Sequence, residues 1–99
     1  MSFEISFSSH DSEHVLLCPY CKGTYLRHNK VEIYERQEDA IIGNHIVVES
    51  DATTIDEIMI GNPSARLNGM KIYFSCEGCS NEPVLSISQH KGETLLSFQ

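Results

Sequence analysis

The sequence predicts a mostly β fold in which an antiparallel sheet is held together by a bound metal ion. Apolar and polar residues alternate along several short segments, as they do in half-buried strands. Glycine, asparagine and proline separate these segments, as expected of turns. All four cysteines of the 99-residue chain lie in two C-x-x-C pairs, a spacing typical of metal sites.

The cysteine pairs are Cys18-Pro19-Tyr20-Cys21 and Cys76-Glu77-Gly78-Cys79. A two-residue spacer lets both thiolates of one tight turn point at the same ion, and zinc binds four such sulfurs at about 2.3 Å. The pattern therefore predicts one structural Zn²⁺ bound by all four cysteines. Iron fits the predicted site less well, and two disulfides are the competing interpretation.

The N-terminal half of the chain begins with an alternating segment, residues 1–9, which predicts an edge strand or an arm with Phe3, Ile5 and Phe7 on one side. We accordingly divide the chain into an N-terminal strand or arm at 1–13 and a β domain at 14–99. Residues 24–36 predict a strand that is interrupted by a turn at His28-Asn29. Its alternation places Val31 and Ile33 toward the core, and the other face carries Lys30, Glu32, Tyr34 and Arg36.

The second half of the chain contains further strand signals at 45–49 and 70–74, and a β-hairpin at 84–98. One short helix is expected between them, because Thr54 and Glu57 have capping-box spacing and Ile55, Ile58 and Met59 recur at helical spacing. Residues 22–75 separate the cysteine pairs, against about 15–20 residues in a compact zinc ribbon. The sequence thus predicts an expanded zinc ribbon with an inserted layer.

The chain is acidic, with a formal net charge of −7, and four thiolates with one Zn²⁺ add −2 to make the bound form −9. Such a charge opposes non-specific binding to nucleic acids and to anionic membranes. The N-terminal segment has no basic region followed by an apolar run, and no segment approaches the roughly 20 apolar residues of a membrane span. We therefore expect a cytoplasmic protein that does not bind membranes.

Two surfaces are candidates for partner binding. The acidic stretch 38–57 is a candidate protein-binding surface, although an ordinary solvated region would have the same composition. A basic and aromatic face is the nucleic-acid alternative, since aromatic rings beside cations suit stacked bases and phosphates. That face would consist of Tyr25, Arg27, Lys30, Tyr34 and Arg36. Exposed strands at 3–7 and 94–98 also allow a homodimer formed by sheet extension.

Parts of the sequence resemble known proteins. The segment Cys-Pro-Tyr-Cys-Lys-Gly at 18–23 resembles the zinc-ribbon superfamily, in which C-P-x-C-x-G recurs. Residues 18–40, 62–66, 76–79 and 87–92 are similar to a group of small bacterial proteins, chromosomal or carried on mobile elements, with no assigned function. The resemblance covers roughly residues 14–98, and it implies zinc ligation by the four cysteines and no further activity.

No catalytic constellation accompanies the cysteines. Four thiolates fill every position of a tetrahedral zinc ion, so no site remains for water or substrate. His10 and His14 have the spacing of metal ligands on a helix, but the segment around them is polar throughout, which favours solvated histidines. We therefore expect a small non-enzymatic zinc protein that acts as a protein-binding or regulatory adaptor, with nucleic-acid binding as the alternative.

Overall fold

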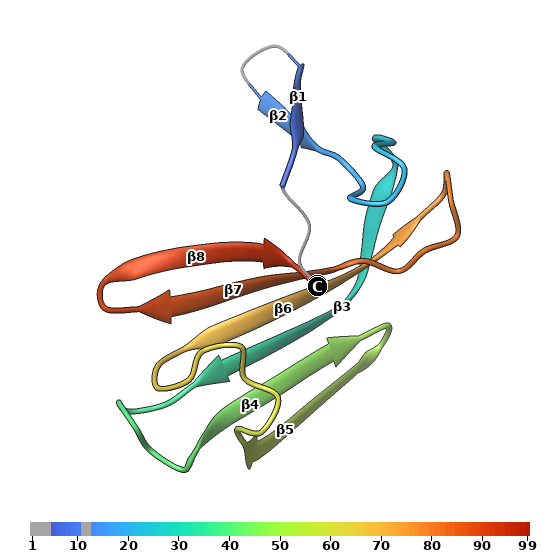
Figure 1. Cartoon of the computed structure of the whole chain (residues 1–99). Coiled ribbons are helices and arrows are strands. Elements are labelled where there is room, and N and C mark those ends of the chain that lie inside the picture. The colour runs from blue at the N-terminus through green and yellow to red at the C-terminus, as the bar shows by residue number, and fades with distance from the viewer. Residues whose placement is uncertain (1–4, 11–12) are drawn as a thin grey trace.

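The computed structural model of the protein describes residues 5–10 and 13–99, and this part of the chain forms eight β-strands and no helix (Figure 1). The strands are β1 Phe7–His10, β2 Glu13–Leu16, β3 Leu26–Glu35, β4 Ile42–Glu49, β5 Ala52–Ile58, β6 Gly69–Cys76, β7 Val84–His90 and β8 Glu93–Phe98. The predicted mostly β, antiparallel fold is confirmed. Phe3, which the prediction included in the first strand, lies outside the described residues.

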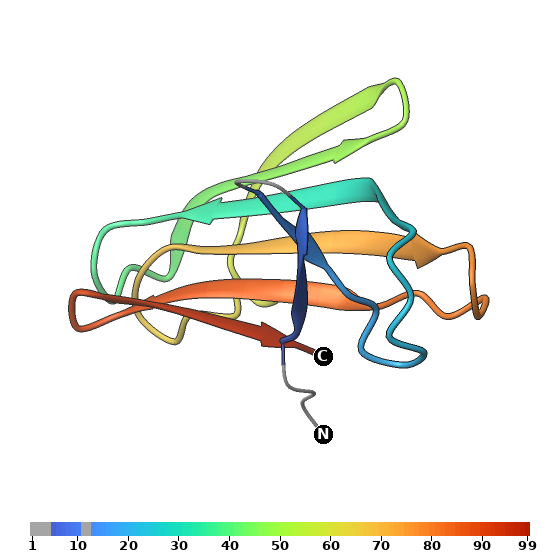
Figure 2. The same ribbon diagram turned by 90° about the horizontal axis from the view of Figure 1, so that it is seen from above.

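The strands form a two-stranded sheet, β1-β2, and a six-stranded sheet of order β5-β4-β3-β6-β7-β8, in which every pairing is antiparallel. β3 and β6 are neighbours at the centre of the large sheet although β4 and β5 lie between them in the chain. Figure 1 shows the β1–β2 hairpin standing away from the large sheet, and in Figure 2 it crosses over the sheet strands when seen from above. The predicted boundary between residues 13 and 14 falls within β2, which pairs with β1.

Two local predictions differ from the structure. The turn predicted at His28-Asn29 does not break the strand, since β3 is continuous, but the register between β3 and β6 shifts between His28 and Lys30. The predicted short helix is wrong, because residues 52–58 form β5 and pair with β4 along most of its length. A helix of two turns has a costly nucleus, whereas β-branched residues such as Thr54 and Ile55 suit a strand that a neighbour supplies with hydrogen bonds.

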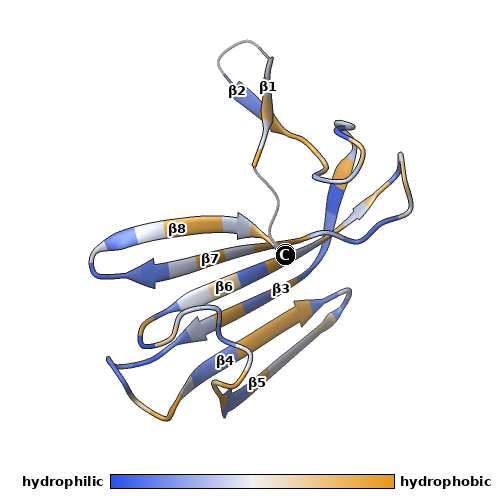
Figure 3. Cartoon of the chain, viewed as in Figure 1, coloured by the Kyte–Doolittle hydropathy of each residue, from blue (hydrophilic) through white to orange (hydrophobic). Residues whose placement is uncertain are grey.

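One face of the large sheet is made of aliphatic side chains that are neighbours across all six strands. Figure 3 shows hydrophobic residues recurring along these strands. We call this the apolar face and define it by two adjacent rows. The first row is Ile55, Ile46, Ile33, Met70, Ile87 and Leu96. The second row is Val48, Val31, Ile72, Leu85 and Phe98.

The opposite, polar face carries Glu32 and Tyr34, and it is the face that the chain covers. Glu32 is 8% and Tyr34 2% exposed, whereas Val31 and Ile33 on the apolar face are only partly buried. The prediction that Val31 and Ile33 face the core is therefore wrong in its choice of face, although the alternation itself is correct. The reason is the connection from β5 to β6, residues 59–68, which crosses the polar face (Figure 1).

Candidate metal centre

Strand pairing brings the two cysteine pairs together. The first C-x-x-C turn precedes β3 and the second begins at the end of β6, and Leu26 lies opposite Cys76 in the antiparallel ladder. Each turn is closed by a backbone hydrogen bond, from Lys22 N–H to Cys18 C=O (2.9 Å) and from Ser80 N–H to Cys76 C=O (3.3 Å). Lys22 and Ser80 occupy equivalent positions and share a positive φ, 62° and 64°. The two turns therefore have the same local shape and present their thiols to one point.

The four sulfurs have the spacing of a tetrahedral metal site. The Sγ atoms of Cys18 and Cys79 are 3.7 Å apart, those of Cys21 and Cys76 are 3.6 Å apart, and all four lie within 4.8 Å of one another. Four sulfurs at about 2.3 Å from zinc are separated by about 3.8 Å along the edges of a tetrahedron. The donor set and its geometry therefore fit one metal ion.

Hydrogen bonds to the sulfurs favour the thiolate form that a metal requires. Gly23 N–H donates to Cys21 Sγ and Gly78 N–H donates to Cys76 Sγ, each at 3.4 Å. The side-chain amide of Asn81 donates to Cys79 Sγ (3.3 Å), and Asn81 lowers the pKa of Cys79 to about 6. These donors stabilise negative charge on the sulfurs.

Crowding of the four sulfurs instead favours the protonated thiol form. The hydrogen bond from Gly23 N–H lowers the pKa of the Cys21 thiol. Hydrogen bonds between Cys21 and the neighbouring thiols, chiefly that of Cys76, outweigh it and raise the pKa of Cys21 to about 12. Four negative sulfurs within one site repel one another, and a divalent cation removes that repulsion. Metal binding therefore releases protons and becomes tighter as the pH rises.

The disulfide interpretation does not fit the structure. All four cysteines are free thiols, and the closest sulfur pairs are far longer than the roughly 2.05 Å of a disulfide. The closest pairs also join one turn to the other instead of joining the two cysteines of one C-x-x-C. Cys18 and Cys76 are buried and Cys21 is exposed, so the site lies at the surface with one side covered by protein.

The predicted basic and aromatic face is not assembled as a single surface. Tyr25 is 69% exposed and Arg27 is also exposed, as the nucleic-acid alternative requires. Lys30 lies over the ring of Tyr73, with Nζ 4.8 Å from the ring centroid. Tyr34 is 2% exposed, and its ring stacks on His45 with centroids 4.4 Å apart, so it offers no surface for a base.

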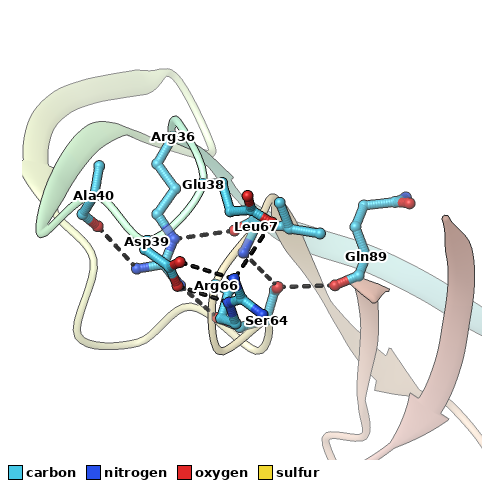
Figure 4. A network of polar contacts seen from close by, with 8 residues as sticks. All are labelled: Arg36, Glu38, Asp39, Ala40, Ser64, Arg66, Leu67 and Gln89. Atoms are coloured by element: carbon cyan, nitrogen blue, oxygen red, sulfur yellow. Dashed lines mark hydrogen bonds and ion pairs between the residues drawn. The ribbon is translucent and has the colours of Figure 1, made fainter. Parts of the chain in front are cut away.

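Arg36, the fifth residue of that predicted face, has a structural role (Figure 4). Its guanidinium donates to three backbone carbonyls, those of Leu67 (3.2 Å), Ala40 (3.2 Å) and Ser64 (2.8 Å). A planar guanidinium with five N–H donors suits this divergent arrangement. Arg36 thereby ties the β3–β4 loop to the 59–68 connection instead of presenting its charge to a phosphate.

The acidic stretch 38–57 is likewise divided between different parts of the molecule. Asp39 accepts two hydrogen bonds from Arg66, at 2.7 and 2.9 Å, in the loop that follows β3 (Figure 4). Glu49 and Asp51 lie at the turn between β4 and β5, at the other end of this hairpin. Asp56 is bound by His45. A single acidic surface made of the whole stretch is therefore not present.

Sequence reasoning missed a cluster of polar side chains on the covered face of the sheet, which we call the Glu32 cluster. Glu32 accepts hydrogen bonds from the hydroxyls of Tyr34 (2.9 Å) and Tyr73, and it also contacts Nε2 of His45 (2.7 Å). His45 Nδ1 in turn contacts Asp56 (2.9 Å). The only signal in the sequence is that each residue occupies the polar face of its strand, and their meeting depends on strand order.

The charges in the Glu32 cluster stabilise one another. Burial raises the pKa of the Glu32 carboxyl, but the hydrogen bonds from Tyr73, His45 and Tyr34 outweigh it and lower the pKa to about 2. Burial likewise lowers the pKa of His45, but its carboxylate partners Glu32 and Asp56 raise it above the ordinary 6.5. Each polar side chain of this cluster is hydrogen-bonded to another member, as in the core of a protein whose polar groups have a structural role.

No protein-family model, curated protein or solved structure matches the chain. Among the described residues, no helix is long and apolar enough to cross a membrane.

Proposed function

We propose that the chain is a non-enzymatic zinc-ribbon protein in which one structural Zn²⁺, held by the four cysteines, joins β3 to β6. The observation that carries this proposal is the sulfur tetrahedron, whose edges match those of a zinc tetrathiolate and whose four positions are all thiols. A closed site of this kind supplies folding free energy and has no position for substrate. This agrees with the resemblance of residues 18–23 to zinc ribbons.

We further propose that the protein functions by binding another protein chain, as an adaptor or regulator. The support comes from the large sheet, on whose apolar face every aliphatic side chain stays at least partly exposed among the described residues and only Phe98 is buried. Exposed contiguous apolar surface of this kind marks interaction sites in soluble proteins. The acidic net charge of −7 favours a protein partner over a nucleic acid.

Native mass spectrometry of the purified protein, with and without chelator, tests the zinc proposal. We expect one zinc per chain, and loss of the folded charge-state distribution when the metal is removed. A metal-free chain four hydrogens lighter than the reduced mass would mean two disulfides and would overturn the proposal. Iron in place of zinc would keep the site and change its occupant.

A further inference from the structure

The chain buries few of its own aliphatic side chains. Hydrophobic residues make up 40% of the sequence, yet none of the isoleucines, leucines and valines among the described residues is buried. The buried hydrophobic residues are Cys18, Tyr34, Met59, Cys76 and Phe98, two of which are metal ligands. A sheet usually buries one face against a second layer. That second layer is absent from the described part of the chain.

The accessible surface shows how much is left uncovered. The surface measures 6799 Å², whereas a compact monomer of 11.2 kDa exposes about 5,700 Å². The excess is about 1,100 Å², which exceeds the roughly 800 Å² that each partner contributes to a standard protein–protein interface. The uncovered area is therefore large enough for a stable interface.

Part of this uncovered surface belongs to the apolar face. Its first row runs across all six strands and its second across five, from β4 to β8, and neither contains a charged side chain. Three of its residues are exposed, Ile55 69%, Leu96 50% and Val48 42% accessible, whereas Phe98 at the end of the second row is buried. The polar face, by contrast, is covered: Gly61 of the 59–68 connection lies so close to the Tyr34 hydroxyl that a Cβ there would be 2.5 Å from it.

We propose that the apolar face binds the same face of a second copy of this chain, which gives a homodimer with two packed sheets. A twofold axis through the face brings each row against an equally apolar row, so the surface is complementary to itself. Two sheets packed face to face leave about 10 Å between them, which aliphatic side chains of this size fill. The inference rests on the proposed protein-binding role and specifies the partner.

Electrostatics are compatible with two acidic chains meeting in this way. Lys30 and Glu32 of β3 belong to the opposite face, and Glu35, at the end of the strand, lies at the border of the apolar face. Repulsion between the two chains of net charge −7 therefore acts across the thickness of the sheets and is screened by salt. Pairing through the edge strand β8, the sheet extension expected from sequence, would leave the apolar face uncovered.

Adjacent leucines in β8 provide a matched test. Leu95 and Leu96 are 46% and 50% exposed but point to opposite faces of the sheet, with only Leu96 on the apolar face. Multi-angle light scattering after size-exclusion chromatography, at about 1–100 µM chain and in zinc-containing buffer, gives the mass of each variant. We expect wild type and Leu95→Lys at twice the 11.2 kDa of one chain. We expect Leu96→Lys to dissociate with a Kd at least tenfold higher, because two lysines then enter the dimer core.

The experiment distinguishes a failure of the homodimer proposal from a failure of the proposed zinc-binding function. Zinc content and far-UV circular dichroism establish that the variants fold, and Ile41→Lys serves as a second control, since Ile41 is 89% exposed in a loop away from the face. A zinc-bound wild type that is monomeric over the whole range would overturn the homodimer and leave a different protein partner in its place. Equal dissociation by Leu95→Lys and Leu96→Lys would also overturn it, because edge pairing would then explain the dimer. A chain without bound metal would refute the proposed function instead.

Discussion

Glu32→Gln removes one negative charge from the centre of the covered face while keeping the shape of the side chain. Folding lowers the pKa of Glu32 from its ordinary 4.5 to about 2, so the ionised carboxylate is more stable in the folded chain than in the unfolded one. At about 1.4 kcal/mol for each tenfold change in proton affinity, this stabilises the fold by about 3 kcal/mol at neutral pH. We expect the substitution to lose about that much, because both tyrosine hydroxyls and His45 lose their charged acceptor.

The measurement is urea denaturation at pH 7 with free zinc held constant, since bound metal adds to apparent stability. Glu35→Gln is the matched control, because Glu35 lies in the same strand but is exposed, and we expect it to change the free energy of unfolding by less than about 0.5 kcal/mol. If Glu32→Gln were as stable as Glu35→Gln, the cluster would not be a stabilising core and the reasoning would be refuted.

Four other predictions follow from the same structure. Cys18→Ser or Cys76→Ser should unfold the domain or sharply reduce its yield, because structural zinc contributes on the order of 10 kcal/mol, comparable with the whole stability of a small domain; a soluble, folded, metal-free variant would contradict this. The raised pKa of His45 contributes stability that is complete below its unfolded value of 6.5 and is lost as the pH rises through the folded pKa. Thermal unfolding of His45→Gln relative to wild type should therefore show its largest deficit near pH 6 and a smaller one near pH 9, and a constant deficit would argue against the ion pairs. Arg36→Ala should cost about 2–3 kcal/mol in urea denaturation and Arg36→Lys should restore little of it, since one ammonium cannot reach three separate carbonyls; full rescue by lysine would show that only charge matters. Fluorescence anisotropy should detect no oligonucleotide binding at about 0.15 M salt, and binding that persists there and weakens in Arg27→Ala would favour the nucleic-acid alternative.

The sequence predicts those features of this protein that depend on local spacing. The paired spacers of the four cysteines predict a shared site, and the structure brings their sulfurs to metal-binding distances. Strand alternation correctly predicts the C-terminal hairpin, whose turn contains Lys91 and Gly92, both with positive φ. These features can be predicted from sequence because two to four neighbouring residues are enough to determine each of them.

Features that depend on the path of the chain could not be predicted in this way. Alternation divides β3 into two faces, but only the route of residues 59–68 decides that the Glu32 side is covered. Residues 52–58 carry signals for both helix and strand, and pairing with β4 decides between them. The partners of Glu32 come from three further positions on β3, β4 and β6 that no sequence interval links.

The order of strands in the large sheet makes the middle of this chain an exchangeable unit. Tyr34 and Gly69 face each other in the β3–β6 ladder, so residues 35–68, which add β4 and β5 beyond β3, begin and end at adjacent points of the sheet. Without residues 35–68 the sheet would still contain four neighbouring strands, β3, β6, β7 and β8, and both cysteine turns. Exchange of this segment would leave the spacing of the four cysteines unchanged, but it would remove His45 and the cover that residues 59–68 give to Tyr34. Related chains should vary most in length here, and each such exchange would widen or narrow the sheet by whole strands.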